Sequence, residues 1–351
     1  MDDTLVIGAG QAGLAAGYVL KQAGLTFTLL EATATPTGSW PHYYESLRLF
    51  SPARFSSLPG YPFPGDPDRY PCRDEVSAYL QAYAEHFSLP ILFHQEVDQV
   101  KQVGSHFQVM AATGTSYQAR TVIAATGPFR QPHLPVFPGQ EHFQGQILHA
   151  AAYRFPDPFR GQRVLVVGAG NSAVQIAVEL AKVAQVTLTS RRSVRFLPQR
   201  PWGRDVHFWM GLLGVDRLAW PSLWQRMTSN PVLDAGPYQA AIAASRPDWR
   251  PLFERLTPQG VMWTNGQAEA VDTIILATGY QFQPAYLSDL PVCDEQGRVQ
   301  HRRGSSVSVP GLFFLGLSYQ RTYASATLRG AGPDAAVVVR QIQRHLHTAR
   351  Q

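Results

Sequence analysis

The sequence has 351 residues, enough for two ordinary domains, and its 45% hydrophobic and 16% charged residues exclude a disordered chain. Its net charge of +5 comes from scattered lysines and arginines without a run of like charges, so we expect no nucleic acid partner. The two cysteines, Cys72 and Cys293, lie far apart and form no C-x-x-C motif, so we predict neither a metal site nor a redox dithiol.

The amino terminus predicts a cytoplasmic protein. A strand-like apolar run begins within three residues of Met1, which leaves no room for a secretory signal. Outside the segments that predict strands and helices, the longest mostly apolar stretch is VHFWMGLLGV at 206–215, about half of the ~20 residues that cross a bilayer. We therefore expect no transmembrane segment.

Residues 4–32 predict a strand, a tight turn, a helix and a second strand. TLVIGAG at 4–10 is a short apolar run ending in glycines, and the following QAGLAAGYVLKQ has small and apolar residues at helical spacing. The second strand, LTFTLLEA at 25–32, contains Glu31 at its end. This order of elements is typical of a dinucleotide-binding Rossmann unit.

Three glycines of this turn each meet a different demand of a bound dinucleotide. Gly8 permits the sharp turn, Gly10 lets the backbone approach a pyrophosphate, and Gly13 lets the helix pack closely on the strand. Glu31 would accept hydrogen bonds from ribose hydroxyl groups. We predict a dinucleotide site, and the alternative is a glycine-rich turn that only packs.

The elements that follow the first unit are predicted from local patterns. Residues 56–71 are rich in proline and glycine and predict an irregular loop, and an amphipathic helix follows at 74–87. A hairpin is expected at 106–119. The strands at 120–129 and 271–282 each contain Ala-Thr-Gly, where the glycine lets the backbone pass close to a nucleotide.

A second unit of the same kind runs from 163 to 192. Adding 160 to each position of the first unit gives these equivalent pairs: Gly8 and Gly168, Gly10 and Gly170, Gly13 and Ala173, Glu31 and Arg191. The acid is thereby replaced by Ser190, Arg191 and Arg192, which can pair with a 2′-phosphate that an acid would repel. We predict NADPH rather than NADH at this turn, and the alternative is that the two arginines are solvated surface residues.

The nucleotide-binding periodicity lapses after the second unit. Residues 195–265 hold six of the seven tryptophans. Such a segment could line an apolar substrate entrance, dock on a membrane surface, form a homodimer contact, or only pack. Further on, PGLFFLGLS predicts a buried strand, and Gly332 and Pro333 predict the start of the last helix.

Further motifs make the chain resemble the class B flavin-dependent monooxygenases, above all their small bacterial members. Phe143, Gly145, His149 and Tyr153 fit the F-x-G-x-x-x-H-x-x-x-aromatic fingerprint of that family. The likeness covers nearly the whole chain through GAGQAG, GSW at 38–40, the two Ala-Thr-Gly strands, GAGNSA and PGLFFLG. The resemblance implies FAD at the first turn and NADPH at the second, with NADH as an alternative donor.

The resemblance also implies a reaction. In that family NADPH reduces the flavin, molecular oxygen adds at C4a, and the bound nicotinamide shields the peroxyflavin from water. We therefore expect oxygenation of small soft nucleophiles such as sulfides or amines, with some ketone activity. Because the cofactors carry the reactive chemistry, His149 is interpreted as a structural residue rather than a general base. A reductase or oxidase acting on a quinone, a disulfide or oxygen, and a slow redox-sensing flavoprotein, are the alternatives.

Two positions depart from the family pattern. The monooxygenases carry an asparagine beside the reactive edge of the flavin, and SLRLFSP at 46–52 puts Phe50 there. An aromatic ring cannot hydrogen-bond a peroxide as an amide can. The fingerprint also ends in Tyr153 rather than the tryptophan of Baeyer-Villiger enzymes, which weakens ring-expanding ketone oxidation. Arg48 is retained and could influence the charge on flavin or nicotinamide, so Phe50 and Arg48 are the candidate catalytic residues.

Cofactor contacts are expected from both turns and from the segments that follow them. The candidates are Gly8, Gly10, Ala12, Gly13, Glu31, Gly38, Ser39, Trp40, Leu47, Val97, Thr126, Gly127, Gly168, Gly170, Asn171, Ser172, Ala173, Ser190, Arg191, Arg192, Thr278, Gly279, Tyr280, Gly316 and Leu328.

The predicted fold class is α/β with two Rossmann-like dinucleotide-binding domains. We expect an FAD domain from 1–155 and 275–351, and an NADP domain from 160–274 that contains the tryptophan-rich insertion at about 195–265. Substrate would meet the flavin in the cleft between the two domains.

Overall fold

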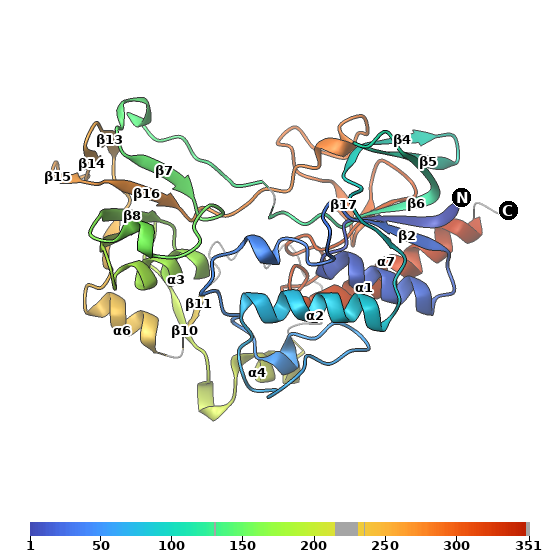
Figure 1. Cartoon of the computed structure of the whole chain (residues 1–351), viewed down its shortest axis with the longest axis horizontal. Coiled ribbons are helices and arrows are strands. Elements are labelled where there is room, and N and C mark those ends of the chain that lie inside the picture. Colours follow the sequence, from blue (N-terminus) through green and yellow to red (C-terminus); the bar gives the residue numbers. More distant parts are fainter. Residues whose placement is uncertain (130, 215–230, 235, 349–351) are drawn as a thin grey trace.

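The computed structural model describes residues 1–129, 131–214, 231–234 and 236–348. The α-helices, labelled as in Figure 1, are α1 (Gln11–Gln22), α2 (Arg73–His86), α3 (Asn171–Leu180), α4 (Val206–Leu212), α6 (Pro237–Ala243) and α7 (Leu328–Thr348). The strands are β1 (Asp2–Ile7), β2 (Phe27–Leu30), β3 (Ile91–Leu92), β4 (Val97–Val103), β5 (His106–Ala111), β6 (Ser116–Ala124), β7 (Gln146–His149), β8 (Arg163–Val167), β9 (Gln185–Ser190), β10 (Phe196–Pro198), β11 (Val232–Asp234), β12 (Asp248–Pro251), β13 (Arg255–Thr257), β14 (Gly260–Met262), β15 (Ala268–Ala270), β16 (Thr273–Leu276), β17 (His301–Arg302), β18 (Ser305–Ser306) and β19 (Leu312–Phe314).

The chain folds into two lobes, each with its own sheet (Figure 1). Within the described part of the chain, the first lobe holds a nine-stranded sheet in the order β17-β18-β19-β6-β1-β2-β3, in which β5 also pairs with β6 and β4 pairs with β5. Because β1 pairs in parallel with both β2 and β6, the segments that follow these three strands lie at one edge of the sheet. Apolar residues of α1, α2 and α7 form a common core with this sheet.

The second lobe holds a parallel sheet with a different cover on each face. In the described ranges its five strands run in the order β12-β9-β8-β16-β7. Successive side chains of a strand point to opposite faces, so Val164 and Val166 of β8 pack with α3 while Leu165 and Val167 pack with Val261 of the antiparallel β13-β14-β15 unit. The near-continuous apolar run of β8 follows from this double burial.

The sheets divide the chain at positions that differ from the bounds expected from the sequence. β7 and β16 pair in parallel inside the second sheet, so both strands lie in the second lobe. The expected bounds at 155 and 275 leave β7 with the first domain and cut through β16. We propose instead that the second domain extends from about residue 145 to about residue 277.

The tryptophan-rich segment at 195–265 is not a single insertion. β12 pairs with β9 as an edge strand of the second sheet, and Trp249 within it donates a hydrogen bond to Ser190 Oγ at 3.1 Å. Trp263 is buried and donates to Glu269, whereas Trp202 is 85% exposed. Trp220 and Trp224 lie outside the described residues. For Trp249 and Trp263 the structure thus shows ordinary packing.

The helices and the hairpin confirm the local predictions, except at one helix start. α1 and α2 match the expected ranges within a residue, and β5 and β6 form the expected hairpin. α7 begins at Leu328, earlier than the start predicted at Gly332, and Pro333 lies inside it. A Cβ at Gly330 would lie 1.9 Å from the Ala324 carbonyl oxygen, so the preceding loop packs directly on the first turn and sets where the helix begins. No described helix has both the length and the apolarity needed to span a membrane.

Candidate functional site

The first glycine-rich turn joins β1 to α1 in a conformation that only glycine adopts easily. Gly8 has φ +98°, and its N–H donates to the Leu30 carbonyl of β2 at 2.8 Å. α1 begins at Gln11 without a side-chain cap, so the amide groups of its first turn can bind an anion. A Cβ on Gly13 would lie 1.9 Å from the Gly8 oxygen, which shows that helix and strand touch as predicted.

Segments distant in sequence converge on this turn. A Cβ on Gly10 would lie 3.3 Å from the Cα of Gly38, and one on Gly316 would lie 2.9 Å from the Cβ of Ala12. The predicted residues of GSW and of the last strand therefore border the turn. Leu328 starts α7 nearby, because Gln11 of α1 donates to the Ala326 carbonyl at 2.9 Å.

Gln11 links three of these segments, although the motif alone gave no reason to select it. Its Nε2 donates to Ala326, and its Oε1 accepts from the indole N–H of Trp40 at 3.2 Å. A glutamine among small residues at the start of a nucleotide-binding helix is the sequence signal that could have identified it.

Glu31 lies at the carboxyl end of β2 and is 5% exposed. Its Oε2 accepts from the Ala9 N–H at 2.8 Å, and its Oε1 accepts from the N–H and the hydroxyl of Thr33 at 3.0 and 2.8 Å. Carboxylate oxygens retain further lone pairs in such an arrangement, so ribose hydroxyl groups could still donate to it. Thr126 and Gly127 follow β6, which pairs with β1, and the Cα of Thr126 lies 3.2 Å from a Cβ built on Gly8. Val97 starts β4, two residues after Gln95, whose N–H donates to the Glu31 carbonyl.

The second turn has the same architecture at the carboxyl ends of β8, β9 and β16. Gly168 is close enough to Ala277 that a Cβ would lie 2.5 Å from its oxygen, so Thr278 and Gly279 follow directly beside the turn. α3 has no side-chain cap, and the Oδ1 of Asn171 is buried without a partner among the described residues. Open space faces Gly170 and Gly279. The uncapped helix and the orphaned amide oxygen fit a bound nucleotide.

The register of the second unit corrects one predicted equivalence. In the first unit Gly8 bonds to the Leu30 carbonyl and Glu31 follows, whereas Gly168 bonds to the Thr189 carbonyl and Ser190 follows. The offset of 160 holds through the turn but becomes 159 at the second strand. Ser190, not Arg191, therefore occupies the place of Glu31, because α3 has ten residues and α1 has twelve, so β9 begins earlier after its turn than β2 does.

Arg191 and Arg192 extend past the end of β9 and are exposed. Ser190 is buried, and its hydroxyl donates to the Arg192 carbonyl at 2.7 Å, which fixes the backbone of this turn. Within the described ranges, the Arg191 side chain has no hydrogen-bond or ion-pair partner. Two guanidinium groups thus stand one and two residues beyond the position of the acid in the first unit.

His149 has a structural position at the end of β7. Its Nδ1 accepts from the Ala151 N–H at 3.0 Å, so its Nε2 carries the proton and donates to the Gly279 carbonyl at 3.0 Å. Its ring contacts that of Tyr280 edge to face. Burial lowers the pKa of His149, so the ring is neutral at neutral pH. Its hydrogen bond to Gly279 holds the loop after β16 in place.

We expect stability to fall below about pH 6.5 in part because of His149. The unfolded chain takes up a proton near a pKa of ~6.5 while the folded ring resists it, so this contribution is present above that pH and is lost as the pH falls toward the folded pKa. The melting temperature of His149→Gln should therefore approach that of the wild type between about pH 7.5 and 5.5. His142→Gln, at an exposed site, is the control. An equal difference at both pH values would contradict the assignment.

The segment from 44 to 50 lies where the two lobes meet. Leu47 and Tyr44 pack against the core of the second lobe, and the Tyr44 hydroxyl donates to Gln175 of α3 at 2.6 Å. Leu49 packs against the core of the first lobe. Phe50 is half-buried at this border, whereas Arg48 is exposed and its guanidinium lies 3.4 Å from the Tyr70 carbonyl. The two candidate catalytic residues therefore differ in environment, although they are neighbours in sequence.

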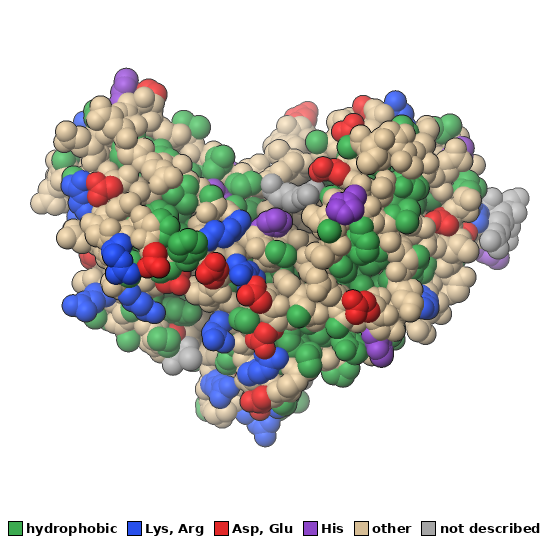
Figure 2. Space-filling view, in the orientation of Figure 1, with side chains coloured by type: hydrophobic (Ala, Val, Ile, Leu, Met, Phe, Trp, Pro, Cys, Tyr) green, Lys and Arg blue, Asp and Glu red, His purple; other side chains and the backbone are tan. Residues whose placement is uncertain are grey.

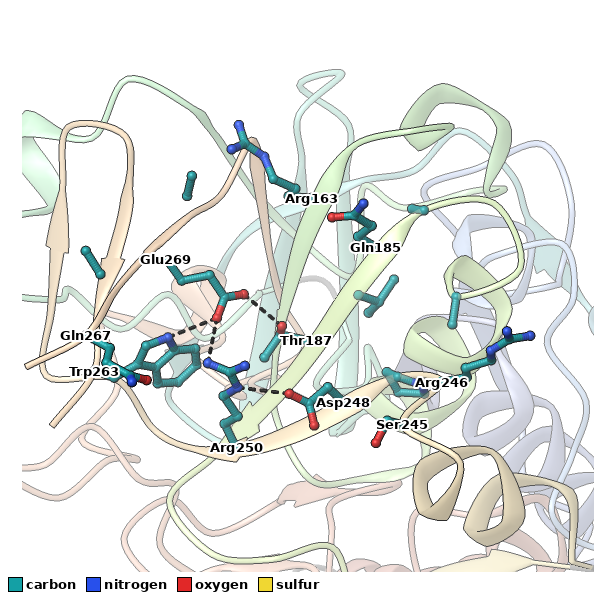
Figure 3. Close-up of a pocket in the computed structure, with 16 residues that line it drawn as sticks. Arg163, Gln185, Thr187, Ser245, Arg246, Asp248, Arg250, Trp263, Gln267 and Glu269 are labelled. Carbon is teal, nitrogen blue, oxygen red and sulfur yellow. Dashed lines mark hydrogen bonds and ion pairs between the residues drawn. The ribbon is translucent and has the colours of Figure 1, made fainter. Parts of the chain in front are cut away.

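The surface is hollowed between the two lobes (Figure 2). A different hollow, of about 1040 Å³, lies at the amino-terminal ends of β8, β9 and β12, the opposite edge of the sheet from Gly168 (Figure 3). In it Arg250 pairs with Asp248 and Glu269 at 2.9 Å each, and Glu269 also accepts from Thr187 and Trp263. Because Arg250, Asp248 and Glu269 pair with one another, we interpret them as structural residues that hold the β13-β14-β15 unit against the second sheet.

Comparison with known proteins agrees with this geometry. Residues 5–205 match the model of the pyridine nucleotide-disulphide oxidoreductase family. An oxidoreductase named CzcO-like, from Geobacillus kaustophilus, is 35% identical, with 98% of this chain and 99% of the relative covered. Indole-3-pyruvate monooxygenase YUCCA1 of Oryza sativa subsp. japonica is 32% identical, with 81% of this chain and 78% of the relative covered.

A solved structure with the same architecture gives a further match. The flavin-containing monooxygenase from Stenotrophomonas maltophilia superimposes with a TM-score of 0.87 at 36% identity, and the match covers 99% of this chain and all of the other. By these likenesses, the chain belongs to the pyridine nucleotide-disulphide oxidoreductase family and is an enzyme of its flavin-dependent monooxygenase group.

Proposed function

We propose that the chain is an NADPH-dependent FAD monooxygenase that transfers one atom of molecular oxygen to small soft nucleophiles such as sulfides or amines, with ketones as poorer substrates. The observation that carries this proposal is the pair of uncapped glycine-rich turns with opposite chemistry beside them. Glu31 accompanies the first, and Ser190, Arg191 and Arg192 accompany the second. The monooxygenases of similar sequence support the reaction class.

The first turn fits the dinucleotide whose ribose hydroxyl groups are free. The amides of α1 would bind the FAD pyrophosphate and Glu31 would accept the ribose hydroxyls. Gly10 and Gly38 face each other with no room for side chains, which brings the backbone of both segments close to the ligand. The flavin, when bound and reduced, supplies the activation of oxygen.

The second turn fits the electron donor. The amides of α3 and the orphaned Oδ1 of Asn171 would contact the nicotinamide nucleotide, and Arg191 and Arg192 would pair with its 2′-phosphate. His149 holds the loop at Gly279 against this turn and exchanges no proton with substrate. The protein's tasks are thus to place two rings against each other and to exclude water.

A second function, an NADPH oxidase or a two-electron reductase of quinones or disulfides, is favoured by one observation. Phe50 stands where the resemblance expects an asparagine amide, and its ring offers no hydrogen bond to an oxygenated flavin. Such an enzyme would pass both electrons of NADPH to oxygen as hydrogen peroxide, or to the other acceptor, without inserting oxygen.

The yield of oxygenated product decides between the two. We expect the purified flavoprotein, given NADPH, oxygen and methyl phenyl sulfide, to form methyl phenyl sulfoxide for most of the NADPH consumed. Chromatography would measure the sulfoxide, and a peroxidase assay would measure hydrogen peroxide. Peroxide equal to the NADPH consumed, with sulfide, amine and ketone alike, would overturn the monooxygenase proposal in favour of the oxidase. NADPH consumption that rises with a quinone or a disulfide would favour the reductase.

A further inference from the structure

A buried carboxylate joins the two lobes beside Phe50. Asp205 and His207 lie at the start of α4 and are 8% and 1% exposed. Asp205 Oδ1 accepts from the backbone N–H and the ring Nδ1 of His207 at 2.9 and 2.7 Å. Its Oδ2 accepts from the Tyr70 hydroxyl at 2.6 Å and from Gln199 Nε2 at 2.8 Å. One carboxylate therefore gathers four donors, and Tyr70 belongs to the loop of the first lobe.

The same groups hold Phe50 by both its backbone and its ring. Gln199 Nε2 also donates to the Phe50 carbonyl at 3.1 Å. The His207 ring lies roughly parallel to that of Phe50, with centroids 6.1 Å apart and planes inclined by 22°. Phe55 contacts His207 in a similar way, with centroids 6.0 Å apart. α4 lies beside the loop at 56–71 of the first lobe, which contains Tyr70 (Figure 1).

The protonation of this cluster follows from its hydrogen bonds. Burial would raise the pKa of Asp205, but the bonds from His207, Tyr70 and Gln199 hold it below its ordinary value. The carboxylate is therefore ionised at neutral pH, and His207 Nδ1 carries a proton. A carboxylate that accepts from one ring nitrogen fixes both the tautomer and the plane of a histidine ring.

We propose that Asp205, His207 and Gln199 are positioning residues that fix the Phe50 ring at the border of the two lobes, where the ring, although it offers no hydrogen bond, excludes water from the flavin and so limits the loss of electrons to hydrogen peroxide. The inference rests on the proposed function, which places Phe50 beside the flavin. In productive turnover one oxygen atom enters the substrate and the other leaves as water. In the unproductive path molecular oxygen takes up the two electrons and two protons and leaves as hydrogen peroxide, and no oxygen atom enters the substrate. The three residues affect the ratio of oxygenated product to hydrogen peroxide through the position of Phe50.

Two substitutions of His207 separate its ring from its hydrogen bond. His207→Asn keeps a donor to Asp205 but removes the ring, and His207→Phe keeps a ring but removes the donor. We expect His207→Asn to raise the peroxide formed per NADPH by about threefold, the order expected for a lost aromatic pair, with an unchanged KM for NADPH. His207→Phe should have a smaller effect. Phe208→Leu, which removes a neighbouring ring of α4 that contacts Trp209 rather than His207, is the matched control and should behave as the wild type.

A double-mutant cycle tests whether the effect passes through Phe50. Phe50→Leu alone should raise the peroxide yield, and adding His207→Asn should change it no further. Additive effects, or equal peroxide yields in every variant, would overturn the inference. If His207→Asn does not fold, Asp205→Asn takes its place in the cycle. Its amide oxygen still accepts hydrogen bonds from His207 at the start of α4, but its NH2 group cannot accept those that Tyr70 and Gln199 donate in the wild type.

Two readouts keep this test separate from that of the proposed function. Proton NMR of the purified protein should show one downfield imidazole N–H signal in the wild type and in Phe50→Leu that is lost in His207→Phe, whereas the signal of the His149 N–H should remain in all three. Without the signal that depends on His207, the Asp205–His207 bond and the inference fail. The rate at which oxygen reoxidises the NADPH-reduced protein without substrate can be measured in an oxidase as well as in a monooxygenase. If the wild type makes peroxide alone, the proposed function fails, while the dependence of this rate on His207 and Phe50 still decides the inference.

Discussion

Gly13→Ala is expected to give a protein that no longer retains its flavin. The new Cβ would lie 1.9 Å from the Gly8 carbonyl oxygen and 2.9 Å from its carbon, and both are backbone atoms that move only if β1 and α1 separate. Separation displaces the amides that would bind the pyrophosphate. We expect the ratio of flavin to purified protein to fall by about tenfold or more, which corresponds to ~1.4 kcal/mol of binding. The melting temperature should fall by about 5 °C or more.

The same helix offers a matched control. In Gly17→Ala the added Cβ would meet the ends of the Leu29 and Leu89 side chains at 3.3 Å, which can adjust. This variant should keep its flavin, as measured by absorbance after gel filtration. Retention of flavin by Gly13→Ala at the level of Gly17→Ala would show that the turn does not hold the cofactor.

The second unit explains why alanine is accepted at one turn and not at the other. Ala173 stands at the position equivalent to Gly13 and is buried. Gly168 has φ +151°, whereas Gly8 has φ +98°, so the two turns differ in shape at their first glycine. The second turn holds the Cβ of Ala173, whereas a Cβ on Gly13 would lie 1.9 Å from the Gly8 oxygen. We therefore expect alanine to be tolerated at this position in the second turn and not in the first.

The double variant Arg191→Ala/Arg192→Ala is expected to raise the KM for NADPH by about 10- to 100-fold. Each charge-assisted hydrogen bond to a phosphate contributes ~1.5–3 kcal/mol, and loss of the pair removes more than one of them. NADH lacks the 2′-phosphate, so its KM should change by less than about twofold. Initial rates of flavin reduction with both nucleotides, followed by stopped flow, would measure the difference.

Arg163→Ala is the matched control for charge. Arg163 also belongs to the second sheet but lies at its amino-terminal edge, paired with Asp272. Its loss should leave both KM values unchanged. An equal rise of the KM for NADPH and NADH in the double variant would instead mean that the two arginines contribute only general surface charge.

Much of the fold could be read from the sequence because it depends on local demands. The turn at Gly8, the helix that follows it and the hairpin of β5 and β6 each need particular residue types at fixed spacing. The same holds for the Gly168 turn, which repeats those demands. Glu31 could be named as a candidate for the first site because it follows the second strand of a Rossmann unit, whereas Gly38 could be named only from the family resemblance of GSW.

The tertiary structure decided what depends on pairing between distant segments. The choice of Ser190 over Arg191 as the counterpart of Glu31 is a matter of strand register, and a one-residue shift leaves no mark in an apolar pattern. The membership of β7 in the second sheet is likewise fixed by its pairing with β16.

The cluster around Asp205 shows most clearly what the sequence alone could not predict. Tyr70, Gln199 and His207 come from two segments without a common motif, and a buried carboxylate brings them together because its burial is favourable only when its oxygens are satisfied. The sequence by itself determined two nucleotide-binding turns and the residues that shape them, because their geometry is local. Only the tertiary structure decided how Phe50 is held between the lobes, because that depends on contacts among side chains far apart in the chain.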